Sequence, residues 1–195
     1  MPLLPLEPFL FPDDLLTGAL SHAPAGSPER WWVLHTRPRA EKSLARCLLG
    51  RGSPFFLPLY QREWRSHGRA RCSNLPLFSG YVFLFGDGQA RLDALDTNHV
   101  AGVLPVADQA RLYSDLAGVY RLMQAGAPLT PEERLEPGAI VEIASGLLAG
   151  LEGKVLRRGK KMKLVVEVQL LQRGVSVEIE RWMIRALPGA RAVLV

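Results

Sequence analysis

The residues best suited to a chemical task lie between Gln61 and Asn74, where arginine and tryptophan side chains are interspersed. Guanidinium groups neutralise phosphates, and an indole ring between them can stack on bases or on guanidinium planes. We interpret this stretch, with one arginine that follows an earlier strand, as a candidate nucleic-acid surface; the alternative is a solvated hairpin tip rich in charge. The candidate residues are Arg37, Arg62, Trp64, Arg65, Arg69 and Arg71, against the single acid Glu63.

Residue types typical of catalysis or metal binding are scattered instead. The histidines have no zinc-ligand spacing, and no P-loop, GxSxG or GxGxxG motif occurs. Paired carboxylates lie in proline-flanked stretches, which lack the burial that tunes a general acid or base. We therefore predict that the protein is no enzyme and needs no metal or cofactor. Cys47 and Cys72 form no CxxC pair, which indicates a reduced, cytoplasmic protein.

Charge is unevenly distributed along the 195 residues. Residues 1–29 carry four acidic and no basic side chains, whereas the remainder carries 24 basic and 15 acidic ones, a net charge of +9. A basic body favours nucleic acid or an acidic partner. The N-terminal arm, 1–29, holds six of the fifteen prolines, so we expect it to be irregular and to cover its own domain. The less favoured alternative is a partner-binding arm. No apolar run is long enough to cross a bilayer, so no membrane association is expected.

Hydrophobic patterning predicts a first domain over residues 30–126. Strands are expected at 31–36, 55–60, 77–85 and 100–106, a hairpin at 61–74, and helices at 40–51, 89–96 and 114–124, the last capped by Ser114. The first six elements of this order fit the ferredoxin-like split βαβ plan, in which two helices cover one face of an antiparallel sheet. The fold class is therefore α+β.

A second domain is predicted over residues 135–188, after a linker at 127–134 and before a tail at 189–195. Five short strands separated by turns predict a small β-barrel. The segment from Glu136 to Val155 resembles a KOW motif, which implies an SH3-like barrel. Within it, Gly146 is expected to take a positive φ in a tight turn, and Gly153 to let a neighbouring strand pass closely.

The first domain resembles the NGN domain of NusG-family transcription factors. The resemblance rests on Trp31 to Thr36 (WWVLHT), Glu41-Lys42, Phe56-Leu57-Pro58, the basic hairpin, and Leu77 to Phe83, where Ser79 replaces the family's usual proline. With the KOW-like segment it spans about residues 30–188. It implies an elongation or antitermination factor that binds the clamp helices of RNA polymerase through an apolar depression and promotes processivity.

The family's polymerase-binding positions correspond here to His35, Phe78, Tyr81 and Phe83. Alternation places Tyr81 and Phe83 on one side of their strand, and Phe78 joins them if Ser79-Gly80 forms a bulge. The alternative is that the three aromatic side chains are core. Val82 and Leu84, on the other side, are expected to bury against the helices. The hairpin and Arg37 would then lie near non-template DNA or nascent RNA.

The KOW domain of such factors recruits a ribosomal protein or the termination factor Rho through a segment that usually reads Ile-Phe-Gly-Arg. The corresponding residues are Leu170-Leu171-Gln172-Arg173, and we take Leu170, Leu171 and Arg173 as the candidate partner site. The departure at 171 and 172 favours a specialised, RfaH-like NusG paralogue, expected as a monomer. The alternative function is a KOW-type RNA- or ribosome-binding module that works without polymerase, through Arg157, Arg158, Lys160, Lys161 and Lys163.

Overall fold

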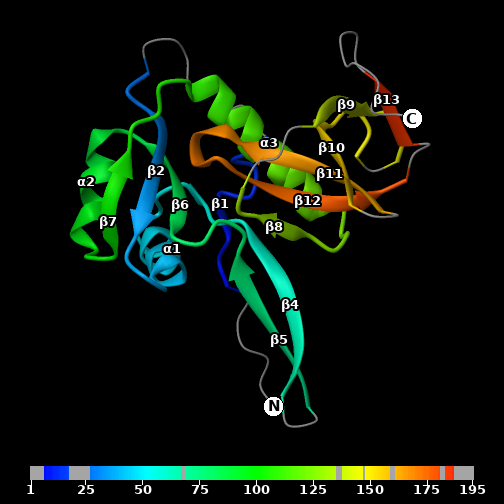
Figure 1. Ribbon diagram of the computed structural model, residues 1–195. Coiled ribbons are helices and arrows are strands. Elements are labelled where there is room, and N and C mark those ends of the chain that lie inside the picture. The colour runs from blue at the N-terminus through cyan, green and yellow to red at the C-terminus, as the bar shows by residue number, and fades with distance from the viewer. Residues whose placement is uncertain are drawn as a thin grey trace. The chain divides into compact units, whose positions relative to one another are not determined.

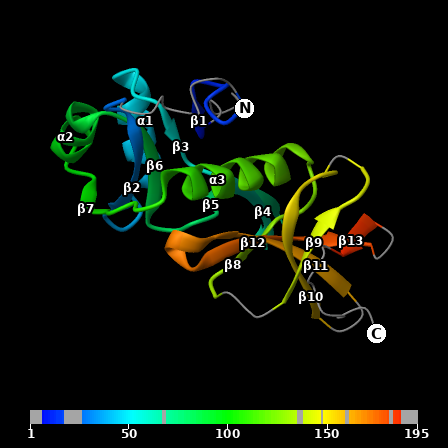
Figure 2. The same cartoon turned by 90° about the horizontal axis from the view of Figure 1, so that it is seen from above.

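The computed structural model describes residues 7–17, 27–66, 69–134, 138–146, 148–158, 161–180 and 183–186. The chain divides into two compact units, Met1–Tyr113 and Ser114–Val195, each with its own main sheet (Figures 1 and 2). The division falls within α3 (Gln109–Gln124), whereas the sequence placed a boundary after this helix. In the part of the chain that is described, no helix is long and apolar enough to span a membrane.

The first unit is built on a five-stranded antiparallel sheet of order β1-β3-β6-β2-β7. Its strands are β1 (Leu10–Phe11), β3 (Phe55–Phe56), β6 (Tyr81–Gly86), β2 (Arg30–Thr36) and β7 (Val100–Leu104). The order from β3 to β7 is that of the ferredoxin-like plan, so this part of the fold class was predicted correctly.

One face of this sheet packs against α1 (Glu41–Gly50) and α2 (Gly88–Asp96). Leu34 on β2, and Val82 and Leu84 on β6, form a buried cluster with Leu44 of α1 and Ala94 of α2. Because successive strand residues point to opposite faces, these positions define the helix-covered side. The predicted burial of Val82 and Leu84 against the helices is confirmed.

The opposite face of the sheet carries a second buried group, and this group is aromatic. The Trp31 and Phe85 rings lie 5.3 Å apart between centroids. Phe83 lies 6.3 Å from Phe56 and 6.0 Å from Phe78, the latter edge to face. Rings at such separations contribute more to stability than their buried area alone. The first unit therefore has buried apolar side chains on both faces of one sheet.

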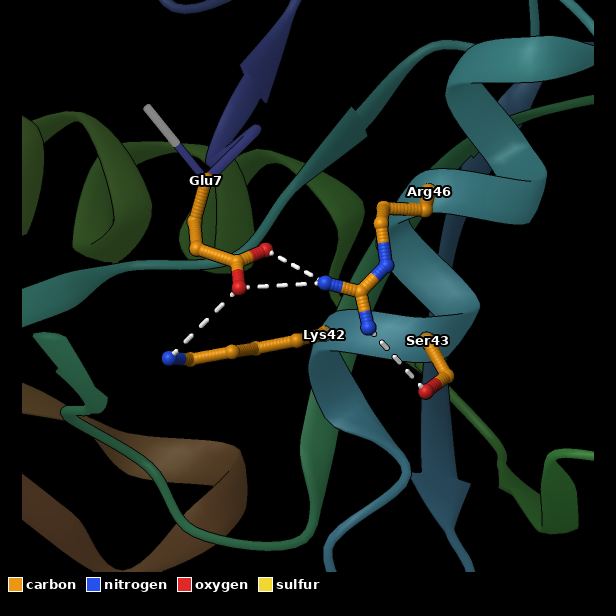
Figure 3. A network of polar contacts seen from close by, with 4 residues as sticks. All are labelled: Glu7, Lys42, Ser43 and Arg46. Atoms are coloured by element: carbon orange, nitrogen blue, oxygen red, sulfur yellow. Dashed lines mark hydrogen bonds and ion pairs between the residues drawn. The ribbon is translucent and has the colours of Figure 1, made fainter. Parts of the chain in front are cut away.

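Part of the N-terminal arm belongs to the first unit. Leu10 and Phe11 pair with Phe56 and Phe55, and Leu15 and Leu16 are buried. Glu7 accepts hydrogen bonds from Arg46 Nη1 at 2.8 and 3.0 Å and lies 3.9 Å from Lys42 Nζ (Figure 3). The prediction that the arm covers its own domain is confirmed for residues 7–17; residues 1–6 and 18–26 lie outside the described part.

The predicted hairpin is present, but the strand after it and helix α3 begin at other residues than expected. β4 (Leu59–Ser66) and β5 (Arg69–Pro76) form a separate two-stranded sheet. The strand expected from residue 77 begins only at Tyr81, after a turn. Helix α3 begins at Gln109 rather than at Ser114, because the Asp108 carboxylate accepts a hydrogen bond from the Arg111 backbone N–H at 2.8 Å and caps it.

The second unit contains a six-stranded antiparallel sheet of order β13-β9-β10-β11-β12-β8. The strands are β13 (Ile184–Ala186), β9 (Ala139–Ile143), β10 (Glu152–Arg158), β11 (Lys161–Val168), β12 (Arg173–Ile179) and β8 (Thr130–Glu132). β8 lies in the stretch predicted as a linker. Pairing among the described strands leaves β13 and β8 at opposite ends of the order, so the predicted closed SH3-like barrel is not seen.

The C-terminal part of α3 packs on this second sheet. Leu116, Val119 and Leu122 are buried, and a Cβ added at Gly118 would lie 3.1 Å from Val166 Cγ1. The glycine expectations are confirmed: Gly146 has a φ of +83°, and a Cβ at Gly153 would lie 2.8 Å from the Val165 carbonyl oxygen. Residues 135–137 of the KOW-like segment, Leu147 and the tail beyond 186 lie outside the described residues.

Candidate functional site

The segment that interrupts the aromatic strand is a β-turn. Tyr81 N donates to Phe78 O at 3.1 Å, and Gly80 has a φ of +86°. A positive φ at the third residue is typical of a type II turn, in which proline is common at the second position. Ser79 holds that second position. The predicted bulge at Ser79-Gly80 is therefore wrong, and the family's Pro-Gly pair has a direct explanation in turn geometry.

Two further hydrogen bonds hold this turn in place. Gly80 N donates to Glu41 Oε1 at 2.7 Å, and Thr36 N donates to Gly80 O at 2.8 Å. Glu41 is only 6% exposed, at the first position of α1. The sequence had drawn attention to Glu41 only as part of the family motif; the turn contact was missed because it joins residues 39 positions apart.

His35 and Tyr81 form a surface pair beside this turn. They lie directly opposite each other on β2 and β6, with ring centroids 5.3 Å apart and an interplanar angle of 38°. His35 is exposed and Tyr81 is half-buried. The structure thus brings together two of the four residues predicted to contact polymerase, on the face opposite the helices.

The other two predicted contact residues are inside the protein. Phe78 is 1% and Phe83 is 0% exposed, and Phe83 lies between the rings of Phe56 and Phe78. Phe83 lies on the same face of the sheet as Tyr81, as expected. At Phe83, however, this face is buried, with the rings of Phe56 and Phe78 close by. The prediction that Phe78 and Phe83 belong to an exposed contact surface is therefore wrong; they pack as core residues near the His35–Tyr81 pair.

The hairpin divides its charged side chains between two faces. Trp64 pairs with Arg71 and Arg62 with Ser73, which places Trp64, Arg62 and Arg71 on one face. Arg65 pairs with Ala70 and therefore faces the other way, with Glu63. Trp64 is 41% exposed, and Arg62, Arg65 and Arg71 are exposed. Arg69 pairs with Ser66 through its backbone, and its side chain lies outside the described part.

Arg37 lies at the end of the sheet from which the hairpin leaves. It follows directly on β2, is exposed, and donates its backbone N–H to His99 O at 2.8 Å. The hairpin connects β3 to the beginning of β6, and the beginning of β6 pairs with the end of β2 at His35. The His35–Tyr81 pair, Arg37 and the hairpin base therefore share one end of the sheet, and Figure 1 shows the hairpin projecting away from it.

In the second unit, the candidate partner segment is a short helical turn. Leu170, which is 37% exposed, and Leu171 lie in η2 (Gln169–Leu171), and Arg173 begins β12. Gln169 N donates to Asp115 Oδ2 at 3.0 Å, which ties the turn to α3. Gln172 has a φ of +51°, a left-handed conformation that glycine adopts most readily. This accounts for the glycine that the family usually carries at position 172.

The basic turn on which the alternative function depends is smaller than predicted. Lys163 Nζ lies 3.6 Å from Glu132 Oε1 and 3.4 Å from Ser176 Oγ, and the Ser176 hydroxyl donates to Glu132 at 2.6 Å. Lys163 is therefore a partly buried side chain engaged with buried Glu132 and Ser176, and its assignment to a free basic turn is wrong. Arg157 is exposed, whereas Lys160 and the side chains of Arg158 and Lys161 lie outside the described residues.

Comparison with known proteins decides the family. A family model described as "Transcription termination factor nusG" matches residues 29–133, more than half of the chain. The protein belongs to the NusG family. The NusG match takes in the sheet from β2 to β7, the hairpin, α3 and β8, and excludes β1 and the strands from β9 onward. Membership makes transcription elongation the class of function.

Two other comparisons add little to the NusG assignment. A search of curated proteins gave no match. Among solved structures, the chain is similar to one described as "Crystal Structure of MjSpt4:Spt5 complex conformation B", at 17% identity over 83% of this chain and 99% of that chain. The TM-score is 0.24, and at this value the likeness supports no conclusion about fold or partners.

Proposed function

We propose that this NusG-family protein is an elongation factor that binds the clamp helices of RNA polymerase through its first unit and promotes processivity or antitermination. It acts by binding, with no bond-making step and no cofactor. The observation that carries the proposal is the His35–Tyr81 pair, in which His35 is exposed and Tyr81 half-buried, beside the base of a hairpin that presents arginine and tryptophan. A protein that binds the His35–Tyr81 pair would lie next to hairpin side chains that are suited to bind nucleic acid.

The polymerase contact proposed here differs from the one predicted by resemblance alone. His35 and Tyr81 are proposed to make the contact, and Phe78 and Phe83 belong to the buried aromatic group of the same sheet. The Phe78–Tyr81 turn sets the start of β6, and Glu41 fixes the turn. Preorganised aromatic side chains lose little conformational entropy on binding, which makes such residues effective anchors.

The hairpin face with Arg62, Trp64 and Arg71 is proposed to contact non-template DNA or nascent RNA. The two arginines supply phosphate contacts, and Trp64 between them supplies a stacking surface. Arg65 on the other face contributes through long-range attraction only. Arg37, at the same end of the sheet, extends the basic surface toward the polymerase contact.

The departures from the family pattern at Leu171 and Gln172 support a specialised, RfaH-like paralogue. Leu170, Leu171 and Arg173 are proposed to recruit a ribosomal protein or a termination factor through the exposed η2 turn. We place this activity in a cytoplasmic monomer. A map of the protein on transcribed genes distinguishes confinement to a few operons, expected of a paralogue, from occupancy of all genes.

A pull-down with cognate core polymerase tests the main proposal. His35→Ala/Tyr81→Ala is expected to weaken polymerase binding about tenfold or more, since loss of an interface anchor typically exceeds about 1.4 kcal/mol. Leu92→Ala, an exposed apolar residue on the helix-covered side, is the matched control and should bind normally. Thermal unfolding confirms that each variant is folded. Unchanged binding by the folded double variant would refute the contact surface.

The second candidate function is RNA or ribosome binding by the second unit without polymerase. Exposed Arg157 favours it; the engagement of Lys163 with Glu132 counts against it. The two readings separate in one RNA-binding assay on the full chain. The alternative requires that Arg157→Gln lowers affinity and that Arg62→Gln/Arg71→Gln does not, and our proposal requires the reverse.

A further inference from the structure

A second basic and aromatic cluster lies in the first unit, away from the hairpin. The guanidinium carbons of Arg30 and Arg91 lie 4.8 and 5.4 Å from the centroid of the Trp32 ring. The Trp32 indole N–H donates to Gly86 O at 2.9 Å, which fixes the ring. We call Arg30, Trp32 and Arg91 the Trp32 cluster. Nothing in the proposed function uses it.

The cluster follows from strand periodicity and from the position of α2. Arg30 and Trp32 are two residues apart on β2, so they share the face that also carries Leu34. This is the helix-covered face, where Ala90 of α2 packs against the core. Arg91 follows Ala90 in the first half of α2 and so reaches the same indole ring from the helix.

The two guanidinium groups have no acidic partner among the residues that the structure describes. Asp87 is engaged as the cap of α2, where its carboxylate accepts the Ala90 N–H at 2.8 Å. Asp93 accepts from Gln89 Nε2 at 2.8 Å. Glu29, next to Arg30 in sequence, is exposed, and neither arginine lies within ion-pair distance of it. Two like charges held over one ring repel each other, and within the described chain no acid offsets that repulsion.

We propose that the Trp32 cluster binds the phosphates of a nucleic-acid strand. A guanidinium stacked on an aromatic ring keeps its in-plane N–H groups free, and these match phosphate oxygens in a two-pronged fashion. Both guanidinium carbons lie within 5.4 Å of the centroid of the same ring, so the two groups are near enough to contact neighbouring phosphates of one strand. Their charge and geometry suit a polyanion with regularly spaced phosphates.

The position of the cluster makes it a contact separate from the hairpin. β2 begins at Arg30 and ends beside the hairpin base, so the two sites lie at opposite ends of this strand. Six residue steps of strand span about 20 Å. A strand that passes from one site to the other with duplex-like spacing, about 3.4 Å per nucleotide, would cover about six nucleotides. The inference extends the nucleic-acid part of the proposed function but needs neither polymerase binding nor the hairpin.

Fluorescence anisotropy of a labelled strand of about 20 nucleotides, titrated with the full chain from about 50 to about 300 mM NaCl, tests this. Arg30→Gln/Arg91→Gln is expected to bind about tenfold more weakly at about 0.1 M salt. Its salt slope should be shallower by about 1.4, or about 0.7 per lost phosphate contact. The control Arg134→Gln/Arg185→Gln removes the same charge from exposed positions of the second unit and should change binding far less.

A third variant tests whether the contact depends on charge alone or also on the planar guanidinium donors. Arg30→Lys/Arg91→Lys keeps the charge but loses the planar donors, so it should retain the salt slope and lose part of the affinity. If Arg30→Gln/Arg91→Gln binds no more weakly than its control, the proposal is overturned. It is also overturned if a labelled polyglutamate binds the wild type and is lost in the Gln variant while nucleic-acid binding is unchanged, because the site then belongs to an acidic protein segment.

Failure of this inference and failure of the proposed hairpin role are distinguishable. The Trp32 cluster substitutions are repeated in a protein that already carries Arg62→Gln/Arg71→Gln. Independent sites give the same fold-loss in both backgrounds. If the hairpin does not bind nucleic acid, its own substitutions have no effect, yet the Trp32 cluster substitutions still weaken binding. Thermal unfolding of each variant shows that the loss occurs in folded protein.

Discussion

The Glu41 carboxylate accepts a hydrogen bond from the Gly80 backbone N–H at 2.7 Å, so the first turn of α1 is tied to the turn that precedes Tyr81. This contact couples two elements that the family carries as separate sequence signatures. It also explains why an acidic residue occupies the first position of α1, where it additionally complements the positive end of the helix.

Loss of the Glu41 contact should destabilise the protein measurably. Glu41→Ala leaves the Gly80 N–H without its acceptor in a part-buried site, which costs about 1–3 kcal/mol. Glu41→Gln keeps an oxygen acceptor and should lose about half as much or less. Urea unfolding checks both values. Equal stability of the wild type and the alanine variant would show that the contact has no structural weight.

The conformation of Gly80 gives a second prediction. Gly80→Ala forces a side chain into a φ of +86° at a cost of about 1–2 kcal/mol. The added Cβ would lie 3.6 Å from the His35 ring, an ordinary contact, so the cost arises from the backbone. Gly88→Ala at the start of α2 meets nothing within 4 Å and is the control, expected to be neutral or stabilising. Thermal unfolding measures both variants.

Trp64 should contribute stacking energy to nucleic-acid binding. Trp64→Ala is expected to lose about 1–3 kcal/mol of affinity for a single strand, whereas Trp64→Phe should keep most of it. Arg65→Gln, on the opposite face of the hairpin, should act only through charge. Anisotropy titrations at fixed salt provide the comparison. A larger loss for Arg65→Gln than for Trp64→Ala would reverse the assignment of the binding face.

The N-terminal arm should be held by apolar burial rather than by its ion pairs. Glu7→Gln removes the contacts to Arg46 and Lys42, which are partly exposed, and should cost less than about 1 kcal/mol. Leu15→Ala empties a fully buried position and should cost about 2–5 kcal/mol. Urea unfolding measures the loss of unfolding free energy in each of the two variants. A greater effect of Glu7→Gln would mean that the ion pairs shown in Figure 3 hold the arm.

Lys163 should be structural rather than RNA-binding. Lys163→Met removes the ammonium group that lies 3.6 Å from the buried Glu132 carboxylate, so the second unit should lose about 1–3 kcal/mol. The RNA affinity of the folded variant should fall only as much as expected from the loss of one positive charge that does not contact the RNA. Calorimetry measures the stability, and anisotropy at two salt concentrations measures the affinity.

The local sequence pattern correctly predicted those elements whose residues favour, by their own propensity, the secondary structure that they adopt. Trp31 to Thr36 is rich in aromatic and β-branched residues and forms β2 within one residue of expectation. Strand alternation also assigned Val82 and Leu84 to the helix side correctly. Alternation cannot say whether the other side is covered, because the burial of Phe83 depends on Phe56 and Phe78 from other segments.

The errors occur where a long-range contact overrides a weak local signal. Thr130-Pro131-Glu132 reads as a linker, since proline removes a backbone donor, yet the buried Glu132–Ser176 hydrogen bond accompanies its pairing with β12. At α3, Ser114 and Asp108 are both acceptable caps in sequence, and only the hydrogen bond to Arg111 distinguishes them. The Glu41–Gly80 contact and the approach of Arg91 to Trp32 were missed because each joins residues that are far apart along the chain.

The pairing of β1 with β3 has a consequence for solubility. Without residues 7–17, β3 would present an unpaired row of backbone donors and acceptors beside Phe55 and Phe56, a template for edge-to-edge aggregation. β1 pairs with that edge and is followed at once by Pro12, which has no backbone N–H and therefore makes the new edge a poor template. The segment that lies outside the family match thus guards the family domain against self-association.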